Sequence, residues 1–156
     1  MVNSSEVVDS SNLSFAVTAN DIDTAARRIS DVVAATPLQY CERLSVATGA
    51  HVYLKREDLQ IVRSYKIRGA YNLMAQLTPQ ELAAGVVTAS AGNHAQGVAF
   101  ACRSMQVRGR IYVPANTPKQ KRDRILVHGS DHVELIVTGD TFDAAAAAAA
   151  ADAERT

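Results

Sequence analysis

Apolar residues recur at helical spacing near the start of this chain. Over residues 20–36 they fall three and four positions apart, which predicts one amphipathic helix. Its apolar face consists of Ile22, Ala25, Ala26, Ile29, Val32 and Val33. We expect Asn20 or Asp21 to cap this helix and Pro37 to end it. Residues 1–19 are rich in Ser, Asn and Val without a period, which predicts a flexible N-terminal arm.

Beyond residue 50, short apolar runs alternate with helical patterns. The expected strands are 51–54, 86–89, 110–113 and 133–137, and the expected helices are 41–44, 66–77, 78–84, 93–104, 118–128 and 142–156. Thr78 and Glu81 form a capping-box pattern around Pro79, which marks one helix start clearly. Short, fully apolar strands that alternate with helices are typical of a parallel sheet covered on both faces. The sequence therefore predicts an α/β fold.

Charge and cysteine content exclude several classes of function. The 16 basic and 16 acidic residues cancel, so no bulk charge indicates a nucleic acid or an anionic membrane as partner. The basic run 119–124 has no interleaved aromatic residue, and we interpret it as a solvated helix face. Cys41 and Cys102 match no metal-ligand spacing and are expected to be reduced. No apolar stretch is long enough to span a membrane, so the expected location is the cytoplasm.

The histidines do not form a metal-ligand pattern. His94 has no second ligand at helical spacing, and Gly129 separates His128 from His132. We therefore expect no metal site.

Lys66 is the candidate catalytic residue because its amine lies at the expected start of the helix over 66–77. We expect Ser64 to cap this helix, and Tyr65 and Ile67 to shield the amine partly. The positive end of the helix dipole and desolvation both favour the neutral amine. A neutral amine is the nucleophile that forms an imine with an aldehyde cofactor. A solvated surface lysine is the structural alternative.

A turn of small residues between an apolar strand and a helix is the second candidate. Its members are Ser90, Ala91, Gly92, Asn93 and His94. Backbone N–H groups at a helix N-terminus can hold a carboxylate, and Gly92 allows close approach of the backbone to a ligand. An N-cap made by Ser90 or Asn93 explains the pattern equally well. Together with Lys66, the turn suggests a pyridoxal phosphate (PLP) enzyme that acts on an amino acid.

Three runs carry a resemblance to a known family. Residues 55–60, 64–72 and 88–99 resemble the threonine dehydratase (threonine ammonia-lyase) family of fold-type II PLP enzymes. The run 117–125 is similar to the biosynthetic branch of that family, and the resemblance covers residues 20–156. Judged from its residues alone, the charged loop over 55–60 is expected to have a structural role.

The resemblance implies a division of the chain within the tryptophan synthase β-like architecture. Residues 1–19 would be an arm, 20–54 the N-terminal segment of the large PLP domain, and 55–156 the small α/β domain. Family members continue well beyond this length, with a glycine-rich loop that holds the PLP phosphate and often a regulatory domain. We therefore expect this chain to be a fragment of a longer, homo-oligomeric enzyme.

The resemblance also implies roles for individual residues. Lys66 would carry the internal aldimine with PLP and later remove the α-proton of the substrate. Asn93 would donate a hydrogen bond to the ring hydroxyl oxygen of the cofactor, and the whole turn over 90–94 would grip the substrate carboxylate. The implied reaction converts L-threonine to 2-oxobutanoate and ammonia, for isoleucine synthesis.

Three alternatives remain open. Ala91 stands where racemase-like relatives carry a serine that acts as the second acid/base, so elimination is favoured over racemisation. A serine/threonine dehydratase or a threonine synthase of the same superfamily has the same motifs. A non-catalytic remnant module, which binds a partner chain or nothing at all, is the alternative from another class.

Overall fold

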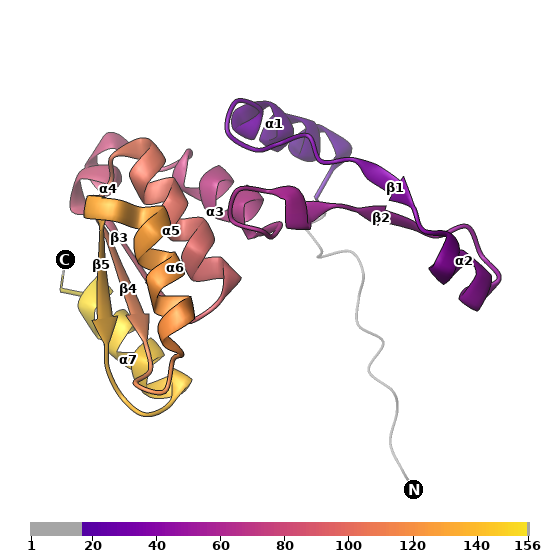
Figure 1. Ribbon diagram of the computed structural model, residues 1–156. Helices are drawn as coiled ribbons and strands as arrows, with labels where there is room; N and C mark the ends of the chain where they lie inside the picture. The colour runs from indigo at the N-terminus through magenta and orange to yellow at the C-terminus, as the bar shows by residue number, and fades with distance from the viewer. Residues whose placement is uncertain (1–16, 156) are drawn as a thin grey trace, which may run out of the picture.

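A three-stranded parallel sheet lies at the centre of the computed structural model, which describes residues 17–155 (Figure 1). Its strands are β3 (Val86–Ala89), β4 (Gly109–Val113) and β5 (Val133–Val137), in the order β3-β4-β5. Helices α5 (Asn93–Met105) and α6 (Lys119–Gly129) connect them and pack on one face. Successive right-handed crossovers in one direction place their helices on the same face. The predicted α/β fold, a parallel sheet flanked by helices, is confirmed.

The main core lies between this sheet and α5. Ile111 and Val113 point to this face from the central strand, and both are fully buried. The α5 side chains that meet them are small: Ala95, Val98, Ala99, Ala101 and Cys102. Small side chains let the helix lie close to the strands, which keeps the N-terminal end of α5 near the carboxyl end of β3.

Helix α7 (Phe142–Ala153) covers the opposite face of the sheet. Its alanines at positions 145 and 149 are buried against Tyr112, the β4 residue that points away from the main core. Asp152, one turn further along, forms an ion pair with Arg110 at 2.5 Å. The alanine run is thus an ordinary packed helix, as predicted.

The first helix is shorter than its sequence pattern predicts. Helix α1 spans Ala19–Ile29, and a turn over 30–33 followed by irregular chain leads to Pro37. Thr18 is its N-cap, with a reciprocal capping box to Asp21, so the expected cap at Asn20 or Asp21 was wrong. Most of the predicted flexible arm lies outside the described residues.

An antiparallel hairpin, which the apolar pattern did not predict, follows α1. Strand β1 (Leu38–Tyr40) pairs with β2 (Tyr53–Lys55), and the two project from the rest of the fold together with α2 (Glu42–Thr48) (Figure 1). The expected strand at 51–54 is shifted, and the expected helix at 41–44 is longer. All six strand residues are exposed, so no buried face imposes a period on them.

Two further helices complete the fold. Helix α3 (Lys66–Met74) packs on α5, and α4 (Pro79–Ala84) leads into β3. The Thr78 and Glu81 capping box is present, as predicted. Short 3-10 turns occur at Glu57–Leu59 and Ser130–His132. Among residues 17–155, no helix combines the length and the apolar character needed to cross a bilayer.

Candidate active site

The turn after β3 lies at the carboxyl end of the sheet, where ligands bind in open α/β folds. The Ser90 hydroxyl accepts hydrogen bonds from the backbone N–H groups of Gly92 at 3.2 Å and Ala95 at 3.3 Å. Ser90 therefore supports the helix start from outside, while Gly92 is the N-cap residue and makes no side-chain cap. Within the described chain, the backbone N–H groups of Asn93 and His94 have no hydrogen-bond acceptor.

Lys66 is the first residue of α3 and lies against the first turns of α5. A Cβ atom built on Gly97 would approach the Lys66 carbonyl oxygen to 3.0 Å, so any larger residue here would require the backbone at the start of α3 to shift. The Lys66 side chain is half-buried, and its Nζ lies 5.1 Å from the centroid of the exposed Tyr65 ring. The amine is therefore near the turn, but it is not enclosed in a dry cleft.

The imidazole of His94, in the turn, also lies near the Lys66 amine. Partial burial, and secondly the charge of Lys66, lower the pKa of His94 below its ordinary value. Both effects favour the neutral form of the imidazole. The Asn93 and His94 side chains lie at the start of α5, and both keep contact with solvent, so the desolvation of His94 is incomplete.

Ser64 does not cap α3, which corrects the sequence-based expectation. The N-cap residue is Tyr65, and no side chain caps the helix. The Ser64 side chain is buried, and its hydroxyl has no hydrogen-bond partner among the described residues. The αR backbone of Tyr65 moves the helix start one residue beyond the position where Ser64 could reach.

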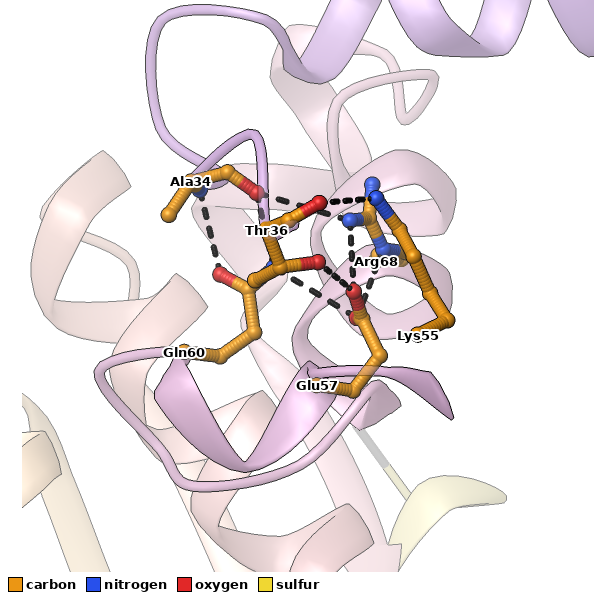
Figure 2. Close-up of polar contacts among 6 residues, drawn as sticks. All are labelled: Ala34, Thr36, Lys55, Glu57, Gln60 and Arg68. Atoms are coloured by element: carbon orange, nitrogen blue, oxygen red, sulfur yellow. Dashed lines mark hydrogen bonds and ion pairs between the residues drawn. The ribbon is translucent and has the colours of Figure 1, made fainter. Parts of the chain in front are cut away.

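An ion pair fixes the first turn of α3 from the other side (Figure 2). The guanidinium of Arg68 donates two hydrogen bonds to the carboxylate of Glu57, from Nε and from Nη2, both at 2.8 Å. Thr36 donates a third hydrogen bond to the same carboxylate at 2.5 Å. These bonds, led by those from Arg68, lower the pKa of Glu57 to about 2. Glu57 is therefore a carboxylate at neutral pH, and it holds α3 two residues beyond Lys66.

The same cluster, which we call the Glu57 clasp, also holds the chain after α1. Gln60 donates to the Ala34 carbonyl oxygen at 2.9 Å and accepts from the Ala34 N–H at 3.1 Å (Figure 2). The Lys55 ammonium donates to the Thr36 carbonyl oxygen. The clasp thus joins three separate stretches of chain at the base of α3. Sequence reasoning assigned 55–60 a structural role but missed this convergence on the lysine helix.

The described residues contain no group of three His, Cys, Asp or Glu side chains that could hold a metal ion. Cys41 and Cys102 are both free thiols.

The side chains present fit an aldehyde cofactor with a polar ring. A primary amine lies beside a helix start whose first N–H groups are free, and Asn93 presents an exposed amide there. An amine supplies covalent attachment, and the amide supplies a hydrogen-bond donor. The buried, unpartnered hydroxyl of Ser64 lies two residues before the amine. The roles of Lys66, Asn93 and the turn residues stay predictions.

Comparison with known proteins gives a family match over most of the chain. Residues 29–156 match the family described as "Pyridoxal-phosphate dependent enzyme". The chain is 68% identical over 140 residues to the protein named L-threonine dehydratase biosynthetic IlvA of Corynebacterium glutamicum, covering 90% of this chain and 32% of that protein. The protein of the same name from Mycobacterium leprae is 69% identical over 140 residues and is covered to 33%. The chain therefore spans about a third of the length of these curated relatives.

Solved structures show the same fold. The processed form of threonine deaminase isoform 2 from Solanum lycopersicum aligns with a TM-score of 0.76 and 40% identity, over 89% of this chain and 41% of that one. Maize serine racemase aligns with a TM-score of 0.83 and 28% identity, over 91% of this chain and 42% of that one. The likeness in fold thus extends to neighbours with different named activities.

Proposed function

This chain belongs to the family of pyridoxal-phosphate dependent enzymes, and on that premise we propose that it is part of a biosynthetic L-threonine dehydratase. The reaction would release 2-oxobutanoate and ammonia from L-threonine. The observation that carries the proposal is the position of the Lys66 amine beside the start of α5, across the Gly97 contact. High identity to proteins of that name supports the choice of substrate.

Lys66 would hold the cofactor covalently through Nζ. Once the incoming amino acid has displaced this amine from the cofactor, the amine would accept the proton from the Cα of the amino acid. PLP, when bound, supplies an electron sink that acidifies this Cα–H bond. The lowered pKa of His94 disfavours a second positive charge beside the Lys66 ammonium.

The turn would orient the substrate through its carboxylate. The free backbone N–H groups of Asn93 and His94 point to an anion at the positive end of the α5 dipole. The Asn93 amide would donate a hydrogen bond to the ring oxygen of the cofactor. Ser90 would act through the turn, because its hydroxyl is engaged with the N–H groups of Gly92 and Ala95.

Ala91 favours elimination over racemisation within the superfamily. It is half-buried in the turn and carries no hydroxyl that could move a proton on the opposite face of the substrate. Serine/threonine dehydratase or threonine synthase activity is the second candidate, since both would use the same amine and turn. Product analysis with L-threonine and with L-serine distinguishes them by the keto acid or amino acid released.

Covalent attachment at Lys66 is the test of the proposal. We expect the chain mixed with PLP to show the absorbance band of a lysine-linked cofactor, and borohydride reduction followed by peptide mapping to place the added mass on Lys66. Lys66→Ala should lose both signals. Lys119→Ala, which removes an exposed lysine paired with Asp123, should keep them.

Absence of the band in the unmodified chain, or an equal band in Lys66→Ala, would contradict the proposal. The first result would favour a non-catalytic module instead.

We also infer the setting of the whole enzyme. Free thiols and a biosynthetic role favour the cytoplasm, and the resemblance favours a homo-oligomer. The division into an arm, a large-domain segment and a small domain stays a proposal too. The proposed boundary between residues 54 and 55 is crossed by a small core, in which Ile29 and Val33 of the large-domain segment pack with Val62 and Ile67 of the small domain.

A further inference from the structure

A polar cleft of about 360 Å³ lies between the start of α5 and the first turns of α6, beside the candidate active site. It is lined by Gly92, Asn93 and Gln96 from α5, and by Gln120, Lys121 and Arg124 from α6. Figure 1 shows these two helices side by side on one face of the sheet. Lys66 does not line the cleft, so it is distinct from the place proposed for the amine.

The cleft carries unbalanced positive charge. Lys121 and Arg124 form no ion pair with any described residue, and no acidic side chain lines the cleft. The acid on this helix, Asp123, is paired instead with Lys119 at 2.6 Å. The two cations therefore face a space in which no residue of 17–155 supplies a counter-charge.

Gln96 is an independent sign of a ligand. Its side chain lines the cleft, yet the residue is only 5% exposed. Its amide makes no hydrogen bond to any residue in the described part of the chain, and the amide atoms are not sealed from solvent. Because so little of the residue is exposed, the cleft is the place where this amide can find a partner.

The start of α5 adds positive potential to the cleft. The positive end of the dipole of this 13-residue helix lies beside Gly92 and Asn93, which line the cleft, whereas the N–H groups of Asn93 and His94 stay assigned to the substrate carboxylate. Gly92 has no Cβ, and the space beside it is open to 4 Å. The Gln96 amide, the positive end of the α5 dipole and two cations thus converge on one cleft, and each of them can stabilise an anion.

We propose that this cleft binds an oxyanion of the phosphate class, at a site separate from Lys66. A phosphate has more acceptor oxygens than a carboxylate and a higher charge near neutral pH, which matches two cations beside an amide donor. The volume exceeds that of a phosphate alone, so a small phosphorylated compound fits. Asn93 borders both sites, so an anion here would bear on the turn that orients the substrate.

Direct titration with inorganic phosphate tests the proposal. By calorimetry at low ionic strength, we expect saturable binding that weakens as salt is added. Arg124→Gln should weaken binding about ten- to a hundredfold, the usual loss for a hydrogen bond to a charged group. Lys119→Gln is the matched control: it makes the same charge change on the same helix, outside the cleft, and should leave the affinity unchanged.

Two further measurements make the result decisive. Circular dichroism of Arg124→Gln should match the unmodified chain, because Arg124 is exposed. Lys66→Ala should bind phosphate as before, even though it loses PLP attachment, which separates this proposal from the proposed function. Acetate should compete only weakly.

No saturable binding to the unmodified chain would overturn the proposal. So would equal losses in Arg124→Gln and Lys119→Gln, or loss of phosphate binding in Lys66→Ala.

Discussion

Glu57 links the candidate lysine to distant parts of the chain. Its carboxylate accepts two hydrogen bonds from Arg68 on α3 and one from Thr36, so it ties the lysine helix to the segment after α1. The Glu57 side chain is 16% exposed and that of Arg68 35%, so water screens this pair only in part. A bidentate, partly buried pair of this kind resists replacement by a neutral group.

We expect Glu57→Gln to lower the free energy of unfolding by about 1.5–3 kcal/mol, because it breaks hydrogen bonds to a charged group. Asp58→Asn is the matched control, since the neighbouring Asp58 forms an exposed ion pair with Arg56 and should contribute much less. Urea unfolding of the two variants measures the difference. If Glu57→Gln and Asp58→Asn lowered the free energy of unfolding equally, the Glu57 clasp would have no special role in stability.

The pH dependence of the same variants gives a second readout. The folded-state pKa of Glu57 is lowered to about 2 from an ordinary value of 4.5, so its contribution is fully present above pH 4.5. The contribution is lost as the pH falls from 4.5 toward 2, because the carboxylate must then be protonated. The stability gap between the unmodified chain and Glu57→Gln should narrow over that range.

The contact between α3 and α5 sets where Lys66 lies. At Gly97 an added Cβ would meet backbone atoms: the Lys66 carbonyl carbon at 3.1 Å and the Ile67 nitrogen at 3.3 Å, besides the Lys66 carbonyl oxygen at 3.0 Å. Backbone at a helix start cannot turn aside as a side chain can. A larger residue at this position therefore forces the two helices apart.

Gly97→Ala should destabilise the chain by about 1–3 kcal/mol, the usual cost of overpacking. Gly69→Ala is the control within α3: nothing lies within 4 Å of its added Cβ, so the variant should gain about 0.5–1 kcal/mol of helix stability. Urea unfolding measures whether each variant raises or lowers the free energy of unfolding. A stabilising effect of Gly97→Ala would show that the helices can separate without cost.

Stability is distributed unevenly over the whole molecule. The central strand β4 has neighbours on both edges and three fully or almost fully buried apolar side chains, Ile111, Tyr112 and Val113. The β1 and β2 hairpin has one partner per strand, and its apolar side chains are exposed, among them Leu38 at 64% and Tyr53 at 53%. A two-stranded hairpin without a buried face is marginal in water.

Hydrogen–deuterium exchange should follow this difference. We expect the amides of β4 to exchange most slowly and those of β1 and β2 much faster, because few buried contacts hold the hairpin closed. Mass spectrometry of peptides over 38–55 and 109–113 measures both regions in one experiment. Equal protection of the two would mean that another surface covers the hairpin.

Short-range patterns in the sequence predicted much of this structure. The alternation of short apolar runs with helical patterns was sufficient to predict the parallel sheet, because strands covered by helices on both faces are mostly apolar, as the central strand is at Ile111, Tyr112 and Val113. The capping box at Thr78 was also predictable, since its atoms lie within one turn of chain. Lys66 at the start of a helix and the turn before α5 were placed by the same short-range reasoning.

Contacts between distant residues were decided by the tertiary structure alone. The pairing of β1 with β2, the clasp between Thr36, Glu57 and Arg68, and the cleft between α5 and α6 each join segments that share no local pattern. Even the half-burial of Lys66 depends on how closely α5 approaches it at Gly97. Periodicity and capping act over a few residues, whereas burial and charge pairing depend on which surfaces the fold brings together.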